Sequence, residues 1–311
     1  MLDRCIALLS PSIEKSLAKK NQPVVIDATL GLGGHTHELL SRFPQLKVIG
    51  IDRDKSAIEK TEARLKEFSG RFTIVHAVYD QIPEVLNSLG FTQVDGILFD
   101  LGVSSMQLDF ADRGFSYANE APLDMRMDQS APLTAELVLN TYSHGELARV
   151  IRNYGEERFA SSIAANIVKA RSENRLRTTT DLAELVKASI PAPARRIGGN
   201  PAKRTFQAIR IEVNNELKVL ERAIPAGLDV LEVGGRMVVM SYQSLEDKIV
   251  KRAFQERTES KAPRGLPIEM EEFAPKFTLV FRGSENASDS EIAANSRAQS
   301  VRLRAIERSA A

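Results

Sequence analysis

This sequence has few cysteines and histidines, and its net charge is close to zero. The 311 residues include one cysteine, Cys5, and four histidines, and the formal net charge is +1. A single cysteine excludes an internal disulfide and argues against a cysteine-based metal site, which suits a reducing cytoplasm. Because the charges nearly cancel, a surface that binds a polyanion must be a local patch.

Long apolar segments are missing too. No stretch approaches the roughly 18 apolar residues that a membrane-spanning helix needs. The N-terminus has a short apolar run at residues 6–9 with an acidic residue before it, so we expect no signal peptide and no membrane partner. With 43% hydrophobic and 27% charged residues, the composition is that of a globular protein. We expect a cytoplasmic protein with about two domains.

The first third of the sequence alternates between short apolar and amphipathic segments. The apolar segments, expected to be strands, are residues 24–30, 47–52, 72–79 and 94–100, and the amphipathic segments, expected to be helices, are residues 34–43, 56–68 and 83–90. Short strands separated by helices predict a parallel sheet covered on both faces.

The alternation stops in the middle of the chain and then resumes. Between about residues 105 and 205 the strand signal almost disappears. We expect residues 105–205 to form an inserted helical domain, between the core segments 1–104 and 206–311. The other expected elements are a helix at 206–224, a strand at 236–242, a helix at 245–256 that begins with a capping box of Ser244 and Asp247, and two closing antiparallel strands at 277–283 and 300–308.

Three features fall where expected strands end. They are the glycine turn at residues 31–34, then Asp52, then Asp100. Parallel sheets bind ligands beyond the carboxyl ends of their strands, so these features predict a ligand site. Asp52 lies 19 residues beyond Gly33, the distance at which an acid reaches a bound ribose.

The glycine turn leaves several ligands to consider. A dinucleotide fingerprint needs a third small residue where Thr36 stands, and a P-loop needs a Gly-Lys-Ser/Thr that does not follow. S-adenosylmethionine fits better, because it has a ribose but no pyrophosphate. The alternative is that the glycines only form a tight turn and Asp52 only caps a helix.

A longer segment, residues 99–128, is dense in polar residues and turn formers. It contains DLGVSS at 100–105, QLD at 107–109, RGFS at 113–116 and PLDMRMD at 122–128, and further along the chain come YGEERF at 154–159, RTFQA at 204–208 and SLED at 244–247. In these motifs and their order, the sequence resembles the RsmH (MraW) family. These enzymes are S-adenosylmethionine-dependent 16S rRNA cytidine N4-methyltransferases.

The resemblance implies a class I (Rossmann-like) methyltransferase sheet with an inserted all-helical domain that helps to grip the substrate. It also implies a cofactor site made by Gly33, Gly34, His35, Asp52, Tyr79, Asp100 and Gln107. The sequence departs from the family in three places. It starts inside a lead motif that the family usually has in full, Tyr79 stands where phenylalanine is common, and Gln243 stands where many members have histidine.

Amine methylation needs an acceptor for the amine N–H groups and a grip on the base. We expect Asp100 to orient the amine or the cofactor. Phe115 and Tyr117 are candidates for holding an unstacked base, although they could equally be loop anchors. Arg126, between Asp124 and Asp128, either contacts the nucleotide or belongs to a structural ion-pair loop.

Basic residues gather near the end of the expected inserted domain. The candidates for phosphate binding are Arg195, Arg196, Lys203, Arg204 and Arg210, with a weaker case for Arg297, Arg302 and Arg304. His35 and His37 could suggest a metal pair, but no third ligand is near them, so we expect no metal.

The resemblance implies methyl transfer from S-adenosylmethionine to the N4 of a cytidine in the decoding region of 16S rRNA, within the assembled small subunit. Two alternatives stay open. One is an amino-methyltransferase that acts on DNA, another RNA or a small molecule. The other is a non-catalytic protein that senses the cofactor and binds nucleic acid. Amino-methyltransferases that act on DNA carry an Asp/Asn-Pro-Pro-Tyr/Phe motif where Asp100 stands. Here Leu101-Gly102-Val103 follow Asp100 in place of Pro-Pro-Tyr, which argues against a DNA substrate.

Overall fold

The computed structural model describes residues 1–104, 107, 111–195, 200–260, 262 and 273–311. The chain divides into two compact units, which are treated separately below. The sheet unit comprises Met1–Gly102 and Leu217–Ala311, and the helical unit comprises Val103–Glu216.

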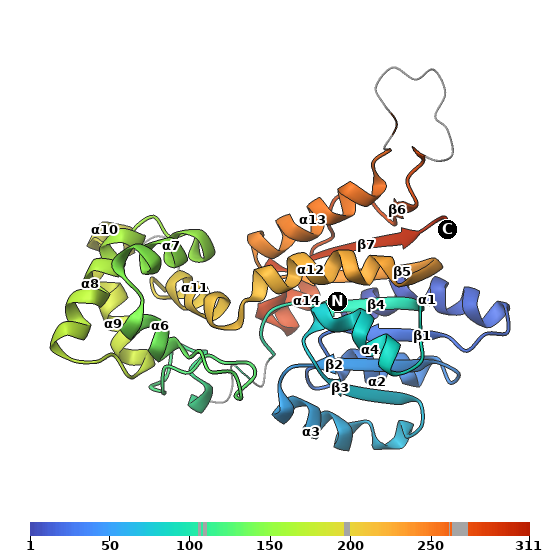
Figure 1. Cartoon of the computed structure of the whole chain (residues 1–311), viewed down its shortest axis with the longest axis horizontal. Coiled ribbons are helices and arrows are strands. Elements are labelled where there is room, and N and C mark those ends of the chain that lie inside the picture. The colour runs from blue at the N-terminus through green and yellow to red at the C-terminus, as the bar shows by residue number, and fades with distance from the viewer. Residues whose placement is uncertain (105–106, 108–110, 196–199, 261, 263–272) are drawn as a thin grey trace. The chain divides into compact units, whose positions relative to one another are not determined.

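The sheet unit is built on seven strands. They are β1 (Val24–Asp27), β2 (Lys47–Asp52), β3 (Phe72–His76), β4 (Val94–Asp100), β5 (Leu231–Ser241), β6 (Phe277–Leu279) and β7 (Arg302–Arg308). Their order is β3-β2-β1-β4-β5-β7-β6 (Figure 1). The first five are parallel, whereas β7 is antiparallel to both β5 and β6. The expected parallel sheet and its antiparallel closing pair are therefore confirmed.

Helices cover both faces of this sheet. The main ones are α1 (Leu2–Ala18), α2 (Gly34–Arg42), α3 (Lys55–Arg64), α4 (Ile82–Ser88), α12 (Glu216–Asp229), α13 (Ser244–Thr258) and α14 (Asp289–Ala294). The apolar side chains of α1 and α2 join one core cluster, while those of α4, α12 and α13 join a second cluster. Helix α1 was not among the expected elements. None of the helices in the described part of the chain is long and apolar enough to cross a membrane.

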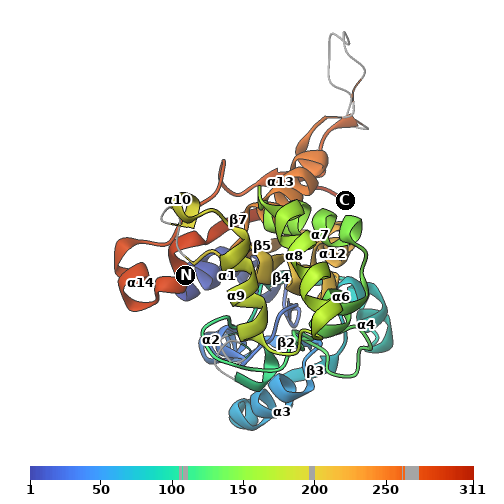
Figure 2. The same ribbon diagram turned by 90° about the vertical axis from the view of Figure 1, so that its left-hand side faces the viewer.

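The helical unit has its own core. Its helices are α6 (Ala135–Thr141), α7 (His144–Gly155), α8 (Ala160–Glu173), α9 (Thr179–Ser189), α10 (Ala192–Arg195) and α11 (Lys203–Asn214). Figure 2 labels α6 to α10, and buried side chains from α6, α7, α8, α9 and α11 form one cluster. The described residues of this unit contain no strand, only a single bridge between Pro122 and Thr178.

The expected helix at 206–224 is wrong, because the chain breaks there into α11 and α12. Asn215 ends α11 in the left-handed conformation, with φ of +53°. Phe206 is buried in the core of the helical unit, whereas Ile224 is buried in the core of the sheet unit. The second boundary therefore falls after Glu216 and not at residue 205, since the apolar face of α11 packs on other helices.

The cap of α13 also differs from the expected one. Gln243 is the N-cap residue, and Glu246 accepts the backbone N–H groups of Tyr242 and Gln243 at 2.9 and 3.1 Å. Asp247, expected to close the capping box, instead accepts two hydrogen bonds from Arg304, at 2.7 and 3.1 Å. The turn that leaves β5 is thus held by the carboxylate of Glu246.

Candidate active site

The glycine turn links the carboxyl end of β1 to the start of α2. Gly31 and Gly33 have φ of +51° and +70°, a region that other residues adopt at a cost. A Cβ on Gly33 would lie 2.6 Å from the Thr61 Cγ2 atom, so Gly33 is required by packing as well as by its backbone. By contrast, a Cβ on Gly34 would meet no described residue within 4 Å beyond its own helix and chain neighbours, which leaves room for a ligand beside the helix start.

Asp52 ends β2 and holds the same turn from the side. Its Oδ2 atom accepts the Gly31 N–H at 2.7 Å, and its Oδ1 atom accepts the Asp54 N–H at 2.8 Å. Burial raises the pKa of Asp52 above its usual value, while the two backbone donors oppose this change. Each carboxylate oxygen can accept a second hydrogen bond, so the side chain can still bind a hydroxyl.

Asp27, at the end of β1, was not among the expected site residues. It is only 1% exposed, and its Oδ2 atom accepts the Thr36 hydroxyl at 2.7 Å. Burial raises the pKa of Asp27. The hydrogen bond between Asp27 and Thr36 ties β1 to the first turn of α2. The position of an acid at the end of the first expected strand was the sequence signal that could have identified Asp27 as a site residue.

Asp100 ends β4 and is held by its two neighbouring strands. Its Oδ1 atom accepts the Tyr242 hydroxyl at 2.9 Å, and its backbone N–H donates to the Thr29 hydroxyl at 2.6 Å. The Oδ2 atom lies 3.9 Å from the His35 Nδ1 atom. Burial raises the pKa of Asp100, and His35 and Tyr242 act in the opposite direction. Tyr242 and Thr29 were both missed from the sequence, because their role depends on strand order.

His35 and Tyr79 complete this edge of the sheet. The Nε2 atom of His35 is buried and has no hydrogen-bond partner among the described residues. The ring of Tyr79 packs edge-on against Phe99, with centroids 5.6 Å apart. The sheet unit thus contains four of the expected cofactor residues together: His35, Asp52, Tyr79 and Asp100.

Other expected residues belong to the helical unit. Gln107 exchanges two hydrogen bonds with Ser104, at 3.1 and 3.2 Å, and its role toward the cofactor stays a prediction. Phe115 is 7% exposed within the helical core, and Tyr117 packs edge-on against Phe206 at 5.7 Å. These packed positions favour the loop-anchor interpretation of the two aromatic residues.

Arg126 forms a compact ion-pair loop with Asp124. Two donors of Arg126 reach the Asp124 carboxylate at 2.9 and 2.7 Å, and its Nη1 atom donates to the carbonyls of Gln129 and Ala131. Burial opposes ionisation of Asp124, but its hydrogen bonds from Arg126 prevail and lower the pKa of the carboxyl. This arrangement favours the structural interpretation of Arg126.

The expected phosphate-binding residues differ in how they are held. Arg210 is paired bidentately with Glu216 at 2.8 and 2.9 Å, and both side chains are largely buried. Arg304 is likewise occupied by Asp247. Arg204 has a side chain that is 58% exposed and lies 3.9 Å from Glu157. Lys203 is exposed, Arg195 donates to the Ile190 carbonyl, and Arg297 and Arg302 are exposed, while Arg196 lies outside the described residues.

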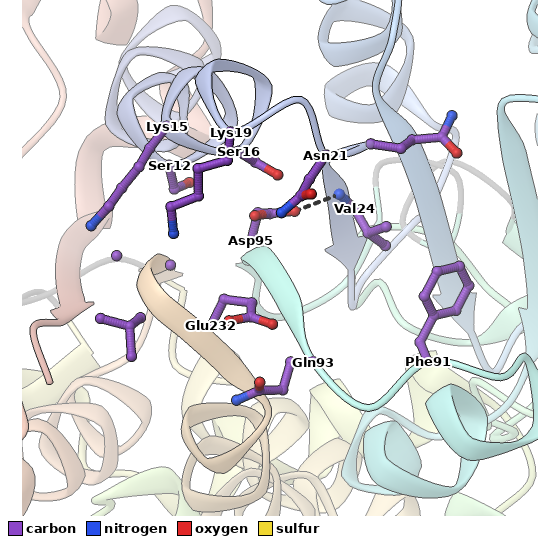
Figure 3. Close-up of a pocket in the computed structure, with 14 residues that line it drawn as sticks. Ser12, Lys15, Ser16, Lys19, Asn21, Val24, Phe91, Gln93, Asp95 and Glu232 are labelled. Atoms are coloured by element: carbon purple, nitrogen blue, oxygen red, sulfur yellow. Dashed lines mark hydrogen bonds between the residues drawn. The ribbon is translucent and has the colours of Figure 1, made fainter. Parts of the chain in front are cut away.

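A pocket of about 270 Å³ lies at the opposite, amino-terminal edge of the sheet (Figure 3). Lys15 and Lys19 of α1 line it together with Asp95 and Glu232, and Asp95 accepts the Val24 N–H at 2.8 Å. Parallel sheets place their ligands at the other edge, so this pocket is separate from the acids described above.

The carboxyl edge fits a nucleoside that carries an amino acid. Strand β1 lies between β2 and β4, so Asp52 and Asp100 flank the glycine turn. Asp52 offers acceptors for ribose hydroxyls, and Asp100 offers one for an N–H donor at the same edge. The open space at Gly34 and the Nε2 atom of His35, which has no partner in the described part of the chain, complete a cradle. The sheet order, with its antiparallel β7, and this cradle define a class I methyltransferase.

The chain belongs to the MraW methylase family, whose model matches residues 1–309. The resemblance drawn from its signature segments is therefore confirmed, and so is the expected fold. Because the family consists of methylases, the chain is a methyltransferase and the expected S-adenosylmethionine is its cofactor.

Several proteins with the name ribosomal RNA small subunit methyltransferase H are similar to this chain. The one from Saccharopolyspora erythraea is 58% identical over 99% of this chain and 92% of its own length. The one from Salinispora tropica is 55% identical over 99% of this chain and 83% of its own. An rRNA methylase structure from Streptococcus thermophilus has 13% identity and a TM-score of 0.40, over 92% of this chain and 87% of that one. A TM-score this low leaves the fold to be judged from the sheet order.

Proposed function

We propose that this methyltransferase transfers the methyl group of S-adenosylmethionine to the exocyclic N4 of a cytidine in the decoding region of 16S rRNA. The proposed substrate form is the assembled small ribosomal subunit. The names of relatives that are 51–58% identical support ribosomal RNA as the substrate. The observation that carries the choice of an amine is the Asp100 carboxylate at the end of β4, with its Oδ2 atom not engaged by Tyr242.

In this proposal, residues from three strand ends hold the cofactor. Asp52 accepts the ribose hydroxyls while it keeps the Gly31 turn in place. Gly33 and Gly34 allow close approach to the backbone, and His35 and Tyr79 border the bound molecule. Gln107 is assigned to the same site by resemblance alone. When bound, the cofactor supplies a methyl group that is already activated by its sulfonium.

The chain's contribution to the chemistry is mainly to position the reactants. The cytosine amine is a weak nucleophile, because its lone pair is delocalised into the ring. A carboxylate that accepts an N–H bond from this amine favours a pyramidal nitrogen and aligns it with the methyl group. Asp100 is placed to accept such a bond, and the backbone of the following segment can supply further acceptors.

The helical unit is proposed to contact the RNA. Of its expected basic residues, Lys203 and Arg204 are exposed and can reach phosphates. Arg210 and Arg126 are engaged in ion pairs within the protein and are better explained as structural. In this proposal, Lys203 and Arg204 form part of a local basic surface, which is compatible with a net charge of only +1.

The test is a methylation assay with the full chain. Small subunits from cells that lack the gene are incubated with the protein and S-adenosylmethionine, and the digested nucleosides are analysed by mass spectrometry. We expect a new N4-methylated cytidine, and its position in the RNA is then mapped by fragment analysis.

Two controls make the assay specific. Protein-free 16S RNA and DNA of matched sequence are used as competing substrates, and we expect transfer to the assembled subunit to be fastest. The Asp100→Asn variant should bind the cofactor but lose nearly all turnover. Methylation of a different atom, or full turnover by Asp100→Asn, would disprove the proposed chemistry.

A further inference from the structure

Tyr242 follows β5 and fixes the orientation of the Asp100 carboxylate. Its hydroxyl donates to the Asp100 Oδ1 atom at 2.9 Å. Asp100 pairs in the sheet with Met240, so the two side chains meet just beyond neighbouring strand ends. Among the described residues, the Oδ2 atom has no hydrogen bond, since the His35 Nδ1 atom is 3.9 Å away. Oδ1 is thus engaged with the protein, and Oδ2 is the oxygen left for a ligand.

The position of Tyr242 is itself determined by its surroundings. Its backbone N–H donates to the Glu246 Oε2 atom at 2.9 Å, and Glu246 is only 3% exposed. Gly102 lies beside the ring, because a Cβ there would be 3.9 Å from the Tyr242 Cδ2 atom. The phenol is therefore held by the cap of α13 on one side and by the segment after β4 on the other.

We propose that Tyr242 is a positioning residue for methyl transfer: by holding the Oδ1 atom of Asp100, it turns the Oδ2 atom toward the reacting N–H donor. This inference rests on the proposed function, in which Asp100 must be charged to orient an amine. Tyr242 itself does not touch the substrate or the cofactor in this scheme.

The charges around Asp100 indicate the direction of the effect. Burial raises the pKa of Asp100, and both His35 and the Tyr242 hydroxyl counteract this by favouring the charged form. Removal of the hydroxyl should therefore raise the pKa of Asp100 further. Methyl transfer would then fail at a higher pH than it does in the unaltered protein.

The other titratable groups near Asp100 come from α1, α2 and β1. They are the amino terminus, Cys5, His35 and Asp27. Burial raises the pKa of Cys5 to about 12, and burial together with Asp100 raises that of Tyr242, so neither ionises near neutral pH. His35 is the main group from which an effect of Asp100 must be distinguished.

The experiment is a pH profile of single-turnover methyl transfer to small subunits, with saturating S-adenosylmethionine. In Tyr242→Phe, we expect the acid limb of the profile to move up by about one pH unit, the usual effect of one lost hydrogen bond to a charged group. At pH values well above the acid limb of both proteins, the transfer rate of Tyr242→Phe should recover to within about threefold of the unaltered protein, since Asp100 is then ionised in both.

Tyr142→Phe is a matched control, because the Tyr142 hydroxyl also donates to a carboxylate, that of Glu212, at 3.0 Å. It removes the same kind of bond from the helical unit and should leave the acid limb in place. Asp100→Asn should lose the limb along with its activity. His35→Asn should retain a limb, which assigns the limb to Asp100.

The results separate this inference from the proposed function. If the unaltered protein methylates no RNA, the proposed function is wrong and this inference falls with it. If it methylates the subunit but Tyr242→Phe is slowed equally at every pH, Tyr242 has only a structural role and the inference is overturned. Should Tyr242→Phe not fold, 3-fluorotyrosine at position 242, a stronger donor, should shift the limb to lower pH, and an unshifted limb would refute the inference.

Discussion

The carboxylate of Asp52 accepts the backbone N–H of Gly31 at 2.7 Å, which joins the end of β2 to the turn that follows β1. The turn is also held by the Thr61 hydroxyl, which donates to the Gly31 carbonyl at 2.7 Å. One acid thus shapes the glycine turn and presents acceptors beside it. The role proposed for Asp52 in binding ribose requires that its carboxylate accept hydroxyl groups while it still accepts the Gly31 N–H.

Asp52→Asn should weaken cofactor binding more than it weakens the fold. The amide keeps one oxygen for a backbone donor but loses the charge and one acceptor, so we expect a 10- to 100-fold lower affinity, or about 1.4 to 2.7 kcal/mol. Calorimetry with S-adenosylhomocysteine measures the affinity. Asp95→Asn, at the opposite edge of the sheet, is the matched control and should bind normally. Equal affinities for Asp52→Asn and the unaltered protein would remove Asp52 from the site.

Much of this edge could be predicted from the sequence, because the relevant signals are local. Apolar runs that end in Asp52 and Asp100 indicate strand ends, and parallel strands bring such ends to one edge. The partners of these acids were not predictable in the same way. Tyr242 meets Asp100 only because β5 lies next to β4, and strand order is a property of the whole sheet.

The helix break at Asn215 shows a different limit. Apolar residues continue at helical spacing from Phe206 to Ile224, so the periodicity alone predicts one helix. The left-handed Asn215 divides that face between two separate cores. Asparagine is a common residue at such helix ends, and this was the one local signal available. The same limit applies to Arg210, whose ion pair with Glu216 spans this break.

Alanine substitutions at the two adjacent glycines should separate folding from binding. Gly33→Ala places a methyl group against Thr61 in a left-handed backbone, so we expect a loss of about 2 to 3 kcal/mol in the free energy of unfolding. Among the described residues, the methyl group of Gly34→Ala meets nothing within 4 Å beyond its own helix and chain neighbours, so this variant should keep or slightly raise stability. Urea denaturation measures both effects.

The more stable of the two variants, Gly34→Ala, should be the one that binds the cofactor more weakly. If S-adenosylmethionine occupies the space beside Gly34, the stable Gly34→Ala variant should bind it at least about tenfold more weakly, since a methyl group then overlaps the ligand. Unchanged affinity in Gly34→Ala would place the cofactor elsewhere along the turn. Thr61→Ser, which removes the clashing methyl group and keeps the hydroxyl, should partly restore the stability of Gly33→Ala.

Asp95 should make folding stability depend on pH. Burial raises the pKa of Asp95 above the ordinary 3.8, although the Val24 N–H counteracts this. A raised pKa in the folded state means that the contribution of Asp95 to stability is full below about pH 3.8 and is lost as the pH rises through the folded value. Asp95→Asn keeps an acceptor for Val24 and cannot ionise.

The Asp95→Asn variant should therefore gain stability relative to the unaltered protein between about pH 4 and neutrality, and the two should converge in acid. Urea denaturation at a series of pH values checks this. The gain should be small, since Asp95 is partly exposed and water screens its charge. If Asp95→Asn instead became less stable than the unaltered protein as the pH rises, the direction assigned to the pKa of Asp95 would be contradicted.

Arg210 and Arg204 should give opposite results, although both belong to the same basic cluster. Arg210→Met leaves the buried Glu216 carboxylate without its bidentate partner, so we expect a loss of about 3 kcal/mol in unfolding free energy. Arg204→Ser removes a side chain that is 58% exposed and should leave stability nearly unchanged. Instead, it should weaken binding to small-subunit RNA and lower the slope of log affinity against log salt by about one. If Arg204→Ser leaves that slope unchanged, the exposed guanidinium does not contact phosphate, and RNA binding must depend on other cations of the chain.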